Sequence, residues 1–280
     1  MTSAVACLQT PVRADMASAL SVALDQAREA VARGARLLAL PEYCGGLVSE
    51  GGMVAPPAAP EAEHPVLEGL RDFAAGAGVW LAIGSVAVSD GAGKTLNRGY
   101  VIDAGGGIVS SYDKIHLFDI QLSLTEVYRE SGRITGGAEA VVVDTPFGRL
   151  GQTICYDLRF PQLHRALAQA GAEIIVSAAA FLRKTGEAHW HVLNRARAIE
   201  NGAFVLAPCA IGPVPGGGES YGHSLIVDPW GRVLADGGAA PGIVTVRIDR
   251  AAVAEARARI PSLGHDRPFD VRVVPAAVPA

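Results

Sequence analysis

Short apolar runs alternate along the chain with stretches whose apolar residues recur at helical spacing. The pattern predicts a strand at residues 3–10, a helix that begins after Asp15 and continues to about Val31, and a buried strand at residues 36–40. Asp15 is a suitable N-cap, and Gly34 follows the helix where a C-terminal glycine belongs. A strand, a helix and a second strand in this order favour parallel pairing through a right-handed crossover.

The rest of the chain repeats this alternation, with hairpins inserted between the strand–helix units. Helices are expected at residues 65–77, 163–170, 187–201 and from a cap at Asp249 to about 259, and strands at 79–88, 97–103, 108–113, 140–144, 149–154, 173–177, 203–208, 223–227, 232–235 and 242–248. Loops are expected at 45–63, 114–139 and 211–219, and the second is long enough to be functional. The pattern predicts a layered α/β protein with a mixed sheet, or two sheets, covered by helices.

Length and composition limit the domain count and the class of partner. The chain has 280 residues, of which 50% are hydrophobic and 19% are charged, and its formal net charge is −4. We expect one domain over residues 1–280, with a core at about 3–260 and an irregular tail at 261–280. The acidic balance argues against binding to nucleic acid or to an anionic membrane surface.

The cysteines and the N-terminal segment indicate the cellular compartment. Cys7, Cys44, Cys155 and Cys209 lie far apart with no C-x-x-C pair, which argues against a disulfide framework and against a structural zinc site. The N-terminal segment has no basic region followed by a long apolar run, and no window approaches the length of a transmembrane helix. We therefore expect a cytoplasmic protein.

Three residues with complementary chemistry each follow the end of an expected strand. They are Glu42, Lys114 and Cys155, and if their strands run parallel in one sheet the three side chains meet at one rim. A carboxylate can take the proton of a thiol, and an ammonium group can stabilise the oxyanion that forms when the thiolate adds to a carbonyl or nitrile carbon. The backbone N–H of Tyr156 is a second candidate donor to that oxyanion. Taken singly, each residue also fits an ordinary role in packing or at the surface.

Three segments around these residues resemble the signature segments of the nitrilase superfamily of carbon–nitrogen hydrolases. They are LPEY (residues 40–43), YDKIHLFD (112–119) and GQTICYDLRFPQL (151–163). Three later segments, at residues 166–174, 181–201 and 220–231, are similar to the Nit branch, which contains omega-amidase and deaminated glutathione amidase. The likeness extends over about residues 4–268.

The resemblance implies a fold, a reaction and an assembly. The implied fold is a four-layer α-β-β-α sandwich with two mixed sheets. Glu42 is then the general base, Lys114 stabilises the tetrahedral intermediate, Cys155 is the nucleophile that forms a thioester, and Glu130 supports the lysine. The resemblance also implies a homodimer formed through the outer helices, and no metal or organic cofactor.

Further residues are candidates for contact with the substrate. Tyr156, Phe181, Thr185 and His189 are expected near the pocket, and His116 is either a residue that orients site groups or a structural histidine. The segments at residues 178–181 and 185–190 depart from the usual family pattern, so the acyl group of the substrate stays open. We expect an amidohydrolase that cleaves a small linear amide to ammonia and a carboxylic acid.

Other functions were weighed against this one. Ser220 lies in a G-x-S-x-G pattern, but a glycine-rich loop precedes it and a hairpin follows it, instead of the strand–turn–helix context of a serine hydrolase. His189 and His191 point in different directions on a helix and would not share a metal. A nitrilase or an N-carbamoyl amino acid hydrolase stays open as an alternative, as does a non-catalytic binding protein.

Overall fold

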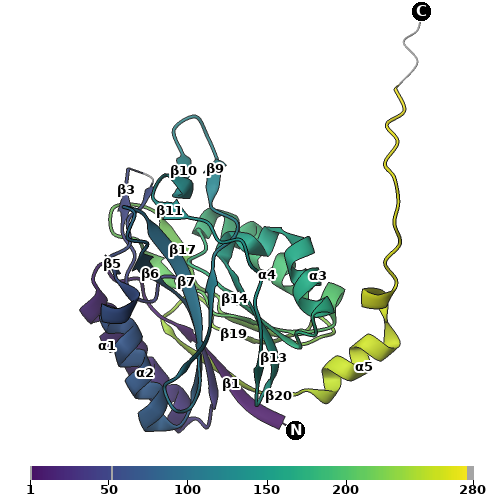
Figure 1. Ribbon diagram of the computed structural model, residues 1–280, viewed down its shortest axis with the longest axis horizontal. Coiled ribbons are helices and arrows are strands. Elements are labelled where there is room, and N and C mark those ends of the chain that lie inside the picture. The colour runs from purple at the N-terminus through teal and green to yellow at the C-terminus, as the bar shows by residue number, and fades with distance from the viewer. Residues whose placement is uncertain (1, 52, 276–280) are drawn as a thin grey trace, which may run out of the picture.

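Two mixed β-sheets lie face to face in the computed structural model, which describes residues 2–51 and 53–275 (Figure 1). The first sheet has the order β11-β7-β6-β2-β1-β20, with β5 beside β6 and β8 beside β7. Its strands are β1 (Thr2–Gln9), β2 (Leu37–Leu40), β5 (Ala58–Ala59), β6 (Trp80–Ser89), β7 (Thr95–Ile102), β8 (Ile108–Asp113), β11 (Ile134–Thr135) and β20 (Gly242–Asp249). As expected, β1, β2 and β6 are parallel neighbours.

The second sheet has the order β12-β13-β14-β15-β18-β19. Its strands are β12 (Val142–Thr145), β13 (Gly148–Ile154), β14 (Ile174–Ala178), β15 (Phe204–Ala207), β18 (Leu225–Val227) and β19 (Val233–Asp236). The three central strands, β13, β14 and β15, are parallel, and antiparallel hairpin strands flank them on both sides. The carboxyl ends of the central strands therefore open at one edge of the sandwich.

Helices cover the outer face of each sheet. They are α1 (Met16–Ala32), α2 (Pro65–Ala77), α3 (Pro161–Gln169), α4 (Arg183–Asn201) and α5 (Ala251–Arg259), and four 3-10 turns in the described chain lie at Glu61–Glu63, Glu130–Gly132, Cys155–Arg159 and Ser262–Gly264. Helices α1 and α2 pack on the first sheet, and α3 and α4 pack on the second (Figure 1). This confirms the predicted α-β-β-α layers.

The period-two alternation of the strands separates two layers of the core. On β1 and β2, Val5 and Leu37 face the second sheet, whereas the intervening Ala6 and Leu38 face helices α1 and α2. These strands are buried on both faces, which explains why their sequences are continuous apolar runs.

Several short elements escaped the sequence analysis. Expected loops contain three hairpins: β3 (Ser49–Glu50) with β4 (Met53–Val54), β9 (Asp119–Gln121) with β10 (Val127–Arg129), and β16 (Ile211–Pro213) with β17 (Glu219–Tyr221). Strands of two or three residues are too short to show a period. Helix α4 begins four residues earlier than expected, and α5 has Arg250 as its N-cap, although Asp249 accepts a hydrogen bond from the Ala251 N–H.

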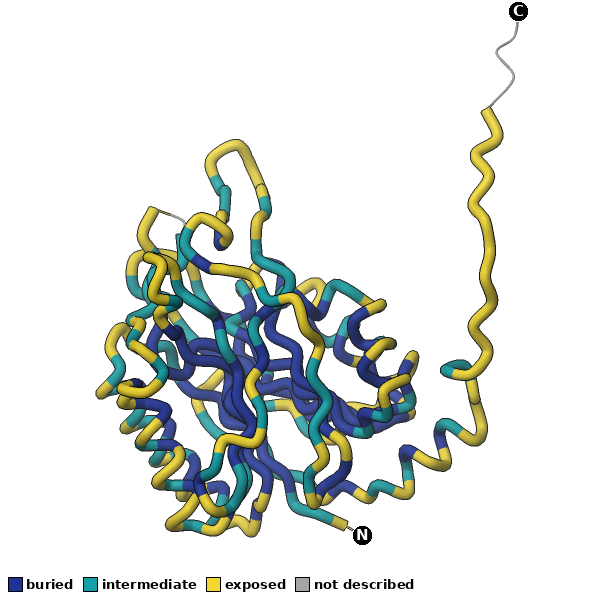
Figure 2. The backbone as a smooth tube through the Cα atoms, viewed as in Figure 1, coloured by how far each residue is buried: buried dark blue, intermediate teal, exposed yellow. Residues whose placement is uncertain are grey.

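The end of the described chain leaves the body of the protein. Residues 265–275 are exposed and extend away from the sandwich (Figure 2). Within the described residues, no helix is both long and apolar enough to cross a membrane.

Candidate active site

Glu42, Lys114 and Cys155 meet at one end of the sandwich. Glu42 lies in the turn after β2 and Lys114 follows β8, so both come from the first sheet, whereas Cys155 follows β13 of the second sheet. The three strands therefore do not share one sheet, which was the condition considered in the sequence. The side chains converge because strand ends of two facing sheets open at the same edge.

Glu42 is buried and each of its carboxylate oxygens has defined partners. Oε1 accepts hydrogen bonds from Lys114 Nζ at 2.9 Å and from Asn97 Nδ2 at 2.9 Å, and Oε2 accepts one from the Ala180 N–H at 2.8 Å. The charge of this carboxylate also raises the pKa of the Cys155 thiol, which lines the same pocket. Glu42 thus contacts the candidate cation directly and acts electrostatically on the candidate nucleophile.

Glu130 holds the ammonium group of Lys114 from the other side. The distances from Lys114 Nζ to the two oxygens of Glu130 are 3.0 and 2.9 Å, and Glu130 also accepts hydrogen bonds from the Phe118 N–H and the Tyr43 hydroxyl. Burial works to lower the pKa of Lys114, but the negative charges of Glu130 and Glu42 outweigh it and raise that pKa well above its usual value. Lys114 is therefore a permanent cation.

Cys155 combines a strained backbone with a protonated side chain. Its φ is +50°, in the left-handed region that non-glycine residues rarely adopt and that clusters at functional sites. Burial and the charge of Glu42 raise the pKa of the thiol well above its usual value, and the opposing charge of Lys114 does not cancel them. The thiol is therefore protonated in the free enzyme, and Glu42 is the carboxylate that can take its proton.

Asp157 fixes the turn that carries the cysteine. One of its oxygens accepts hydrogen bonds from the Ile154 N–H at 2.9 Å and the Tyr112 hydroxyl at 2.7 Å. The other pairs with His116, which offers both its backbone N–H at 3.0 Å and Nδ1 at 2.7 Å. The ring of His116 stacks on Phe160 at 3.5 Å. His116 therefore contacts the support of the cysteine turn and does not line the pocket.

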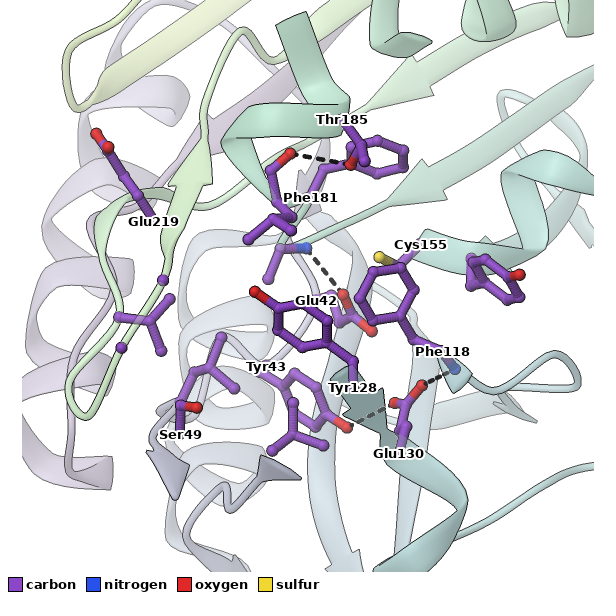
Figure 3. A pocket seen from close by; sticks show the side chains of 18 of the residues that line it. Glu42, Tyr43, Ser49, Phe118, Tyr128, Glu130, Cys155, Phe181, Thr185 and Glu219 are labelled. Atoms are coloured by element: carbon purple, nitrogen blue, oxygen red, sulfur yellow. Dashed lines mark hydrogen bonds between the residues drawn. The ribbon is translucent and has the colours of Figure 1, made fainter. Parts of the chain in front are cut away.

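Above these residues lies a pocket of about 720 Å³, part of which is open to solvent (Figure 3). Its wall is mostly apolar and aromatic, and is formed by Tyr43, Leu47, Val54, Phe118, Tyr128, Tyr156, Ala180, Phe181, Leu182 and Val214, with Ser49, Thr185, Gly217, Gly218 and Glu219. In Figure 3, Ser49 and Glu219 lie far from Cys155, at the opposite side of the pocket. An apolar wall with few polar groups is typical of a small-molecule site.

The expected substrate contacts fall into two groups. Tyr156, Phe181 and Thr185 line the pocket, whereas His189 is exposed on α4, with its Nδ1 3.3 Å from Arg159 Nη1. The Arg159 guanidinium lies 5.8 Å from the ring centre of Tyr156 and 5.3 Å from that of Phe181. Among the described residues Arg159 has no carboxylate partner, so it is an unneutralised cation beside the aromatic wall.

Ser220 lies outside this pocket, in strand β17. Its side chain is buried and its hydroxyl donates a hydrogen bond to the Ala210 carbonyl at 2.7 Å. The strand belongs to the β16–β17 hairpin, which is not the strand–turn–helix elbow of a serine nucleophile.

Some residues assemble the site without chemistry of their own, and no motif in the sequence marks them. Asn97 on β7 donates to Glu42 at 2.9 Å and to Glu130 at 3.3 Å, and its only signal in the sequence is a polar residue in an apolar strand. A Cβ atom on Gly84 would lie 2.4 Å from the Leu40 carbonyl oxygen, so only glycine lets the chain pass beneath the Glu42 turn.

One further cluster of ligand-type side chains lies apart from the pocket. His191, His223 and Asp236 place their ligand atoms within 4.8 Å of one another.

A family model described as carbon–nitrogen hydrolase matches residues 4–258. The chain belongs to the carbon–nitrogen hydrolase family. The predicted family and the predicted class of reaction, hydrolysis of a carbon–nitrogen bond, are thereby confirmed.

Curated relatives and solved structures agree with this membership. Deaminated glutathione amidase of Yersinia enterocolitica is 39% identical over 208 residues, which are 73% of each chain, and that of Dictyostelium discoideum is 40% identical over 72% of this chain and 71% of its own. The NitFhit protein of C. elegans superposes on 95% of this chain with a TM-score of 0.87 and 31% identity. This chain covers only 65% of the NitFhit chain. Saccharomyces cerevisiae Nit3 gives 0.83 at 26% identity, covering 96% of this chain and 97% of its own. An amidase from Nesterenkonia sp. gives 0.75 at 26% identity, covering 92% and 94%.

Proposed function

We propose that the enzyme hydrolyses a small linear amide through a thioester on Cys155, so that R–CO–NH2 and water give R–COOH and ammonia. The observation that carries the proposal is the convergence of Glu42, Lys114 and Cys155 on one pocket, where Glu42 Oε1 accepts a hydrogen bond from Lys114 Nζ at 2.9 Å and the charge of Glu42 acts on the Cys155 thiol. A base, a nucleophile and a cation at the floor of one pocket are the groups that acyl transfer needs.

The first half of the reaction forms the thioester. Glu42 takes the proton of the Cys155 thiol as sulfur attacks the amide carbon, and the new oxyanion accepts hydrogen bonds from Lys114 Nζ and from the Tyr156 N–H. The tetrahedral intermediate collapses, the carbon–nitrogen bond breaks, and the proton held by Glu42 passes to the leaving nitrogen. Ammonia departs, and the carboxylate of Glu42 is ionised again.

The second half hydrolyses the thioester. Glu42 removes a proton from water, the hydroxyl adds to the thioester carbon, and the same two donors stabilise the second oxyanion. When the carbon–sulfur bond breaks, Glu42 returns the proton to sulfur, so the acid leaves and the thiol is restored. Glu130 takes no part in proton transfer: its contacts to Lys114 at 2.9 and 3.0 Å keep the ammonium group in place between two carboxylates.

The curated relatives favour deaminated glutathione as the first substrate to test. This substrate is a secondary amide, so the proton held by Glu42 passes to an amine leaving group in place of ammonia. Its acyl side carries a carboxylate, and Arg159 offers a matching cation beside Tyr156 and Phe181. Hydrolysis of a nitrile or an N-carbamoyl amino acid would use the same three residues, Glu42, Lys114 and Cys155. A substrate panel therefore has to decide between these reactions.

We also propose a homodimer that works in the cytoplasm. Val192, Ile199 and Trp230 are large apolar residues with more than half of their surface exposed on the α4 side of the second sheet, where a second copy would cover them. All four cysteines are unpaired and buried, which suits a reducing compartment. Light scattering at micromolar concentration tests the assembly: we expect a dimer, and a monomer would contradict it.

The nucleophile is tested with Cys155→Ala, using ammonia release from alpha-ketoglutaramate and release of the amine cysteinylglycine from deaminated glutathione as the readouts. We expect a loss of at least about 10⁴-fold in kcat/KM, as when other covalent nucleophiles are removed. Ser220→Ala is the matched control and should stay active. Activity retained by Cys155→Ala and lost in Ser220→Ala would replace the thiol with the serine.

A further inference from the structure

Outside the amide pocket, two imidazoles and a carboxylate converge on one point. His191 Nε2 lies 2.9 Å from Asp236 Oδ2, and His223 Nδ1 lies 2.9 Å from Asp236 Oδ1. The three residues come from α4, from the segment between β17 and β18, and from the end of β19. We propose that His191, His223 and Asp236 bind one divalent cation of the zinc class.

The donor set and the spacing suit such an ion. Imidazole nitrogen and carboxylate oxygen are common zinc ligands, with bonds of about 2.0–2.2 Å, so a tetrahedral site separates its ligand atoms by about 3.3–3.5 Å. Asp236 Oδ2 lies 2.9 Å from His191 Nε2 and 3.2 Å from His223 Nδ1, so these two separations need to open by only a few tenths of an ångström. All three ligand atoms lie within 4.8 Å of one another. Between 25% and 35% of each side chain is exposed, so an ion can enter and a water can complete its shell.

The ligands are held in place by neighbours that are not ligands themselves. The ring of Tyr221 stacks on His223 at 4.5 Å, and Trp190 Nε1 donates a hydrogen bond to the His223 carbonyl at 2.7 Å. The Gly238 N–H binds Asp236 Oδ1 at 2.8 Å. His223 has a φ of +50°, one of the rare left-handed non-glycine residues in the described chain. Oriented ligands with fixed supports are characteristic of metal sites.

This inference departs from the sequence analysis, which predicted no metal. That prediction considered His191 with its neighbour His189, and the two do diverge, because His189 contacts Arg159. The partners of His191 are instead 32 and 45 residues away along the chain, and no spacing rule connects them.

A bound ion would stabilise one wall of the pocket and would not take part in the chemistry. None of its three ligands lines the pocket. The segment before α4 is joined to β17 by the Leu182–Ser220 bridge and by a 2.8 Å hydrogen bond from the Tyr221 N–H to the Phe181 carbonyl. The ion would connect α4 to the segment before β18 and to β19. Together with the bonds to β17, it would hold this wall of the pocket from two sides.

The test is a titration of chelator-treated protein with Zn²⁺ alone, followed by calorimetry and by the melting temperature. The Cys155→Ala background removes the one pocket-facing thiol that could bind the ion. We expect one ion per chain and a higher melting temperature in its presence. His191→Gln, which keeps a hydrogen-bonding side chain, and Asp236→Asn should each weaken binding by more than about 100-fold, since even outer neighbours of a metal contribute 10–100-fold.

His189→Gln is the matched control, because it removes an exposed histidine from the same helix and should bind Zn²⁺ like the parent. Co²⁺ gives a second readout, since its visible spectrum reports ligand number and geometry and should change in His191→Gln. Equal binding by His191→Gln and the parent, or no stoichiometric binding by either, would overturn the proposal. These measurements use an inactive background, so they stand or fall independently of the amidase reaction.

Discussion

The floor and the rim of the pocket are built in different ways. The floor consists of buried charged groups, with Glu42, Lys114 and Glu130 each no more than 3% exposed, and every charge there faces an opposite one. The rim consists of apolar and aromatic side chains, half of them in or beside the short hairpins β3–β4, β9–β10 and β16–β17 and half in the segments that follow β2, β13 and β14. A charge network in a low dielectric tolerates few changes, whereas an apolar wall on short hairpins tolerates many.

This difference suggests that the reaction and the choice of acyl group depend on different residues. In the proposed mechanism the floor carries out the reaction, and loss of Lys114 would leave two buried carboxylates without a cation. In the same proposal the rim selects the acyl group. Substitutions at the floor should therefore reduce the turnover of every substrate alike, and substitutions at the rim should change one substrate relative to another.

The largest effect after loss of the thiol is expected for Glu42→Gln. Removal of the general base should lower kcat/KM by about 10²–10⁴-fold for all amides. The same change should make Cys155 more reactive to iodoacetamide, because the charge of Glu42 raises the pKa of the thiol. In the parent enzyme the alkylation rate should rise with pH from 7 to 9 without levelling, and in the variant it should level at a lower pH.

Glu126→Gln is the control for Glu42→Gln, because Glu126 is a partly exposed carboxylate that binds Lys184 and the Tyr128 hydroxyl and does not line the pocket itself. It should change neither readout. Slower alkylation in Glu42→Gln, or amidase activity near that of the parent, would remove Glu42 from its role as base.

A smaller loss of activity is expected for Lys114→Met. Loss of one oxyanion donor should lower kcat by about 10²–10³-fold. The variant also leaves Glu42 and Glu130 buried without a cation, which should cost roughly 3–5 kcal/mol of unfolding free energy in a urea titration.

Lys184→Met provides the comparison for the stability measurement. Its ammonium group also binds a carboxylate, at 2.9 Å from Glu126, but the side chain is 64% exposed and the pair is screened by water. It should cost less than about 1 kcal/mol. An equal loss in the two variants would contradict the idea that burial distinguishes the floor.

The sequence was sufficient to predict the reacting groups. It was insufficient to predict the residues that hold those groups in place. Cys155 and Glu42 each follow a strand that is apolar enough to recognise, and each carries chemistry that restricts its role. Asn97 has no such mark, because its importance comes from two carboxylates that lie 55 and 33 residues away. The same holds for the contacts of Asp157 to Tyr112 and His116, which join two sheets.

The architecture shows a similar division. Long apolar runs predicted the central strands and most helices, and the sandwich follows from burying both faces of those strands. The hairpin β16–β17 was expected to be a loop, because its glycines and its strands of three residues leave no period to detect. Half of the rim comes from such short hairpins, so its specificity was the part that the sequence left open.

The smallest predicted effect tests the rim directly. Arg159 lies beside Tyr156 and Phe181 and has no carboxylate partner within the described residues, so Arg159→Ala should raise KM for amides with an anionic acyl group. We expect roughly a ten-fold increase for deaminated glutathione and alpha-ketoglutaramate, the scale of one hydrogen bond to a charged group. A neutral amide of similar length should be unaffected in both KM and kcat, and Arg159→Lys should recover part of the loss.

Arg183→Ala is the matched control, because this arginine also lies at the edge of the pocket but is already paired with Glu187 and Glu219. Its charge is neutralised, so its removal should leave the ratio of anionic to neutral substrate unchanged. If Arg159→Ala slowed both classes of amide equally, the guanidinium would act by packing against the aromatic wall. In that case the rim would select the acyl group by shape alone, and only the floor of the pocket would act through charge.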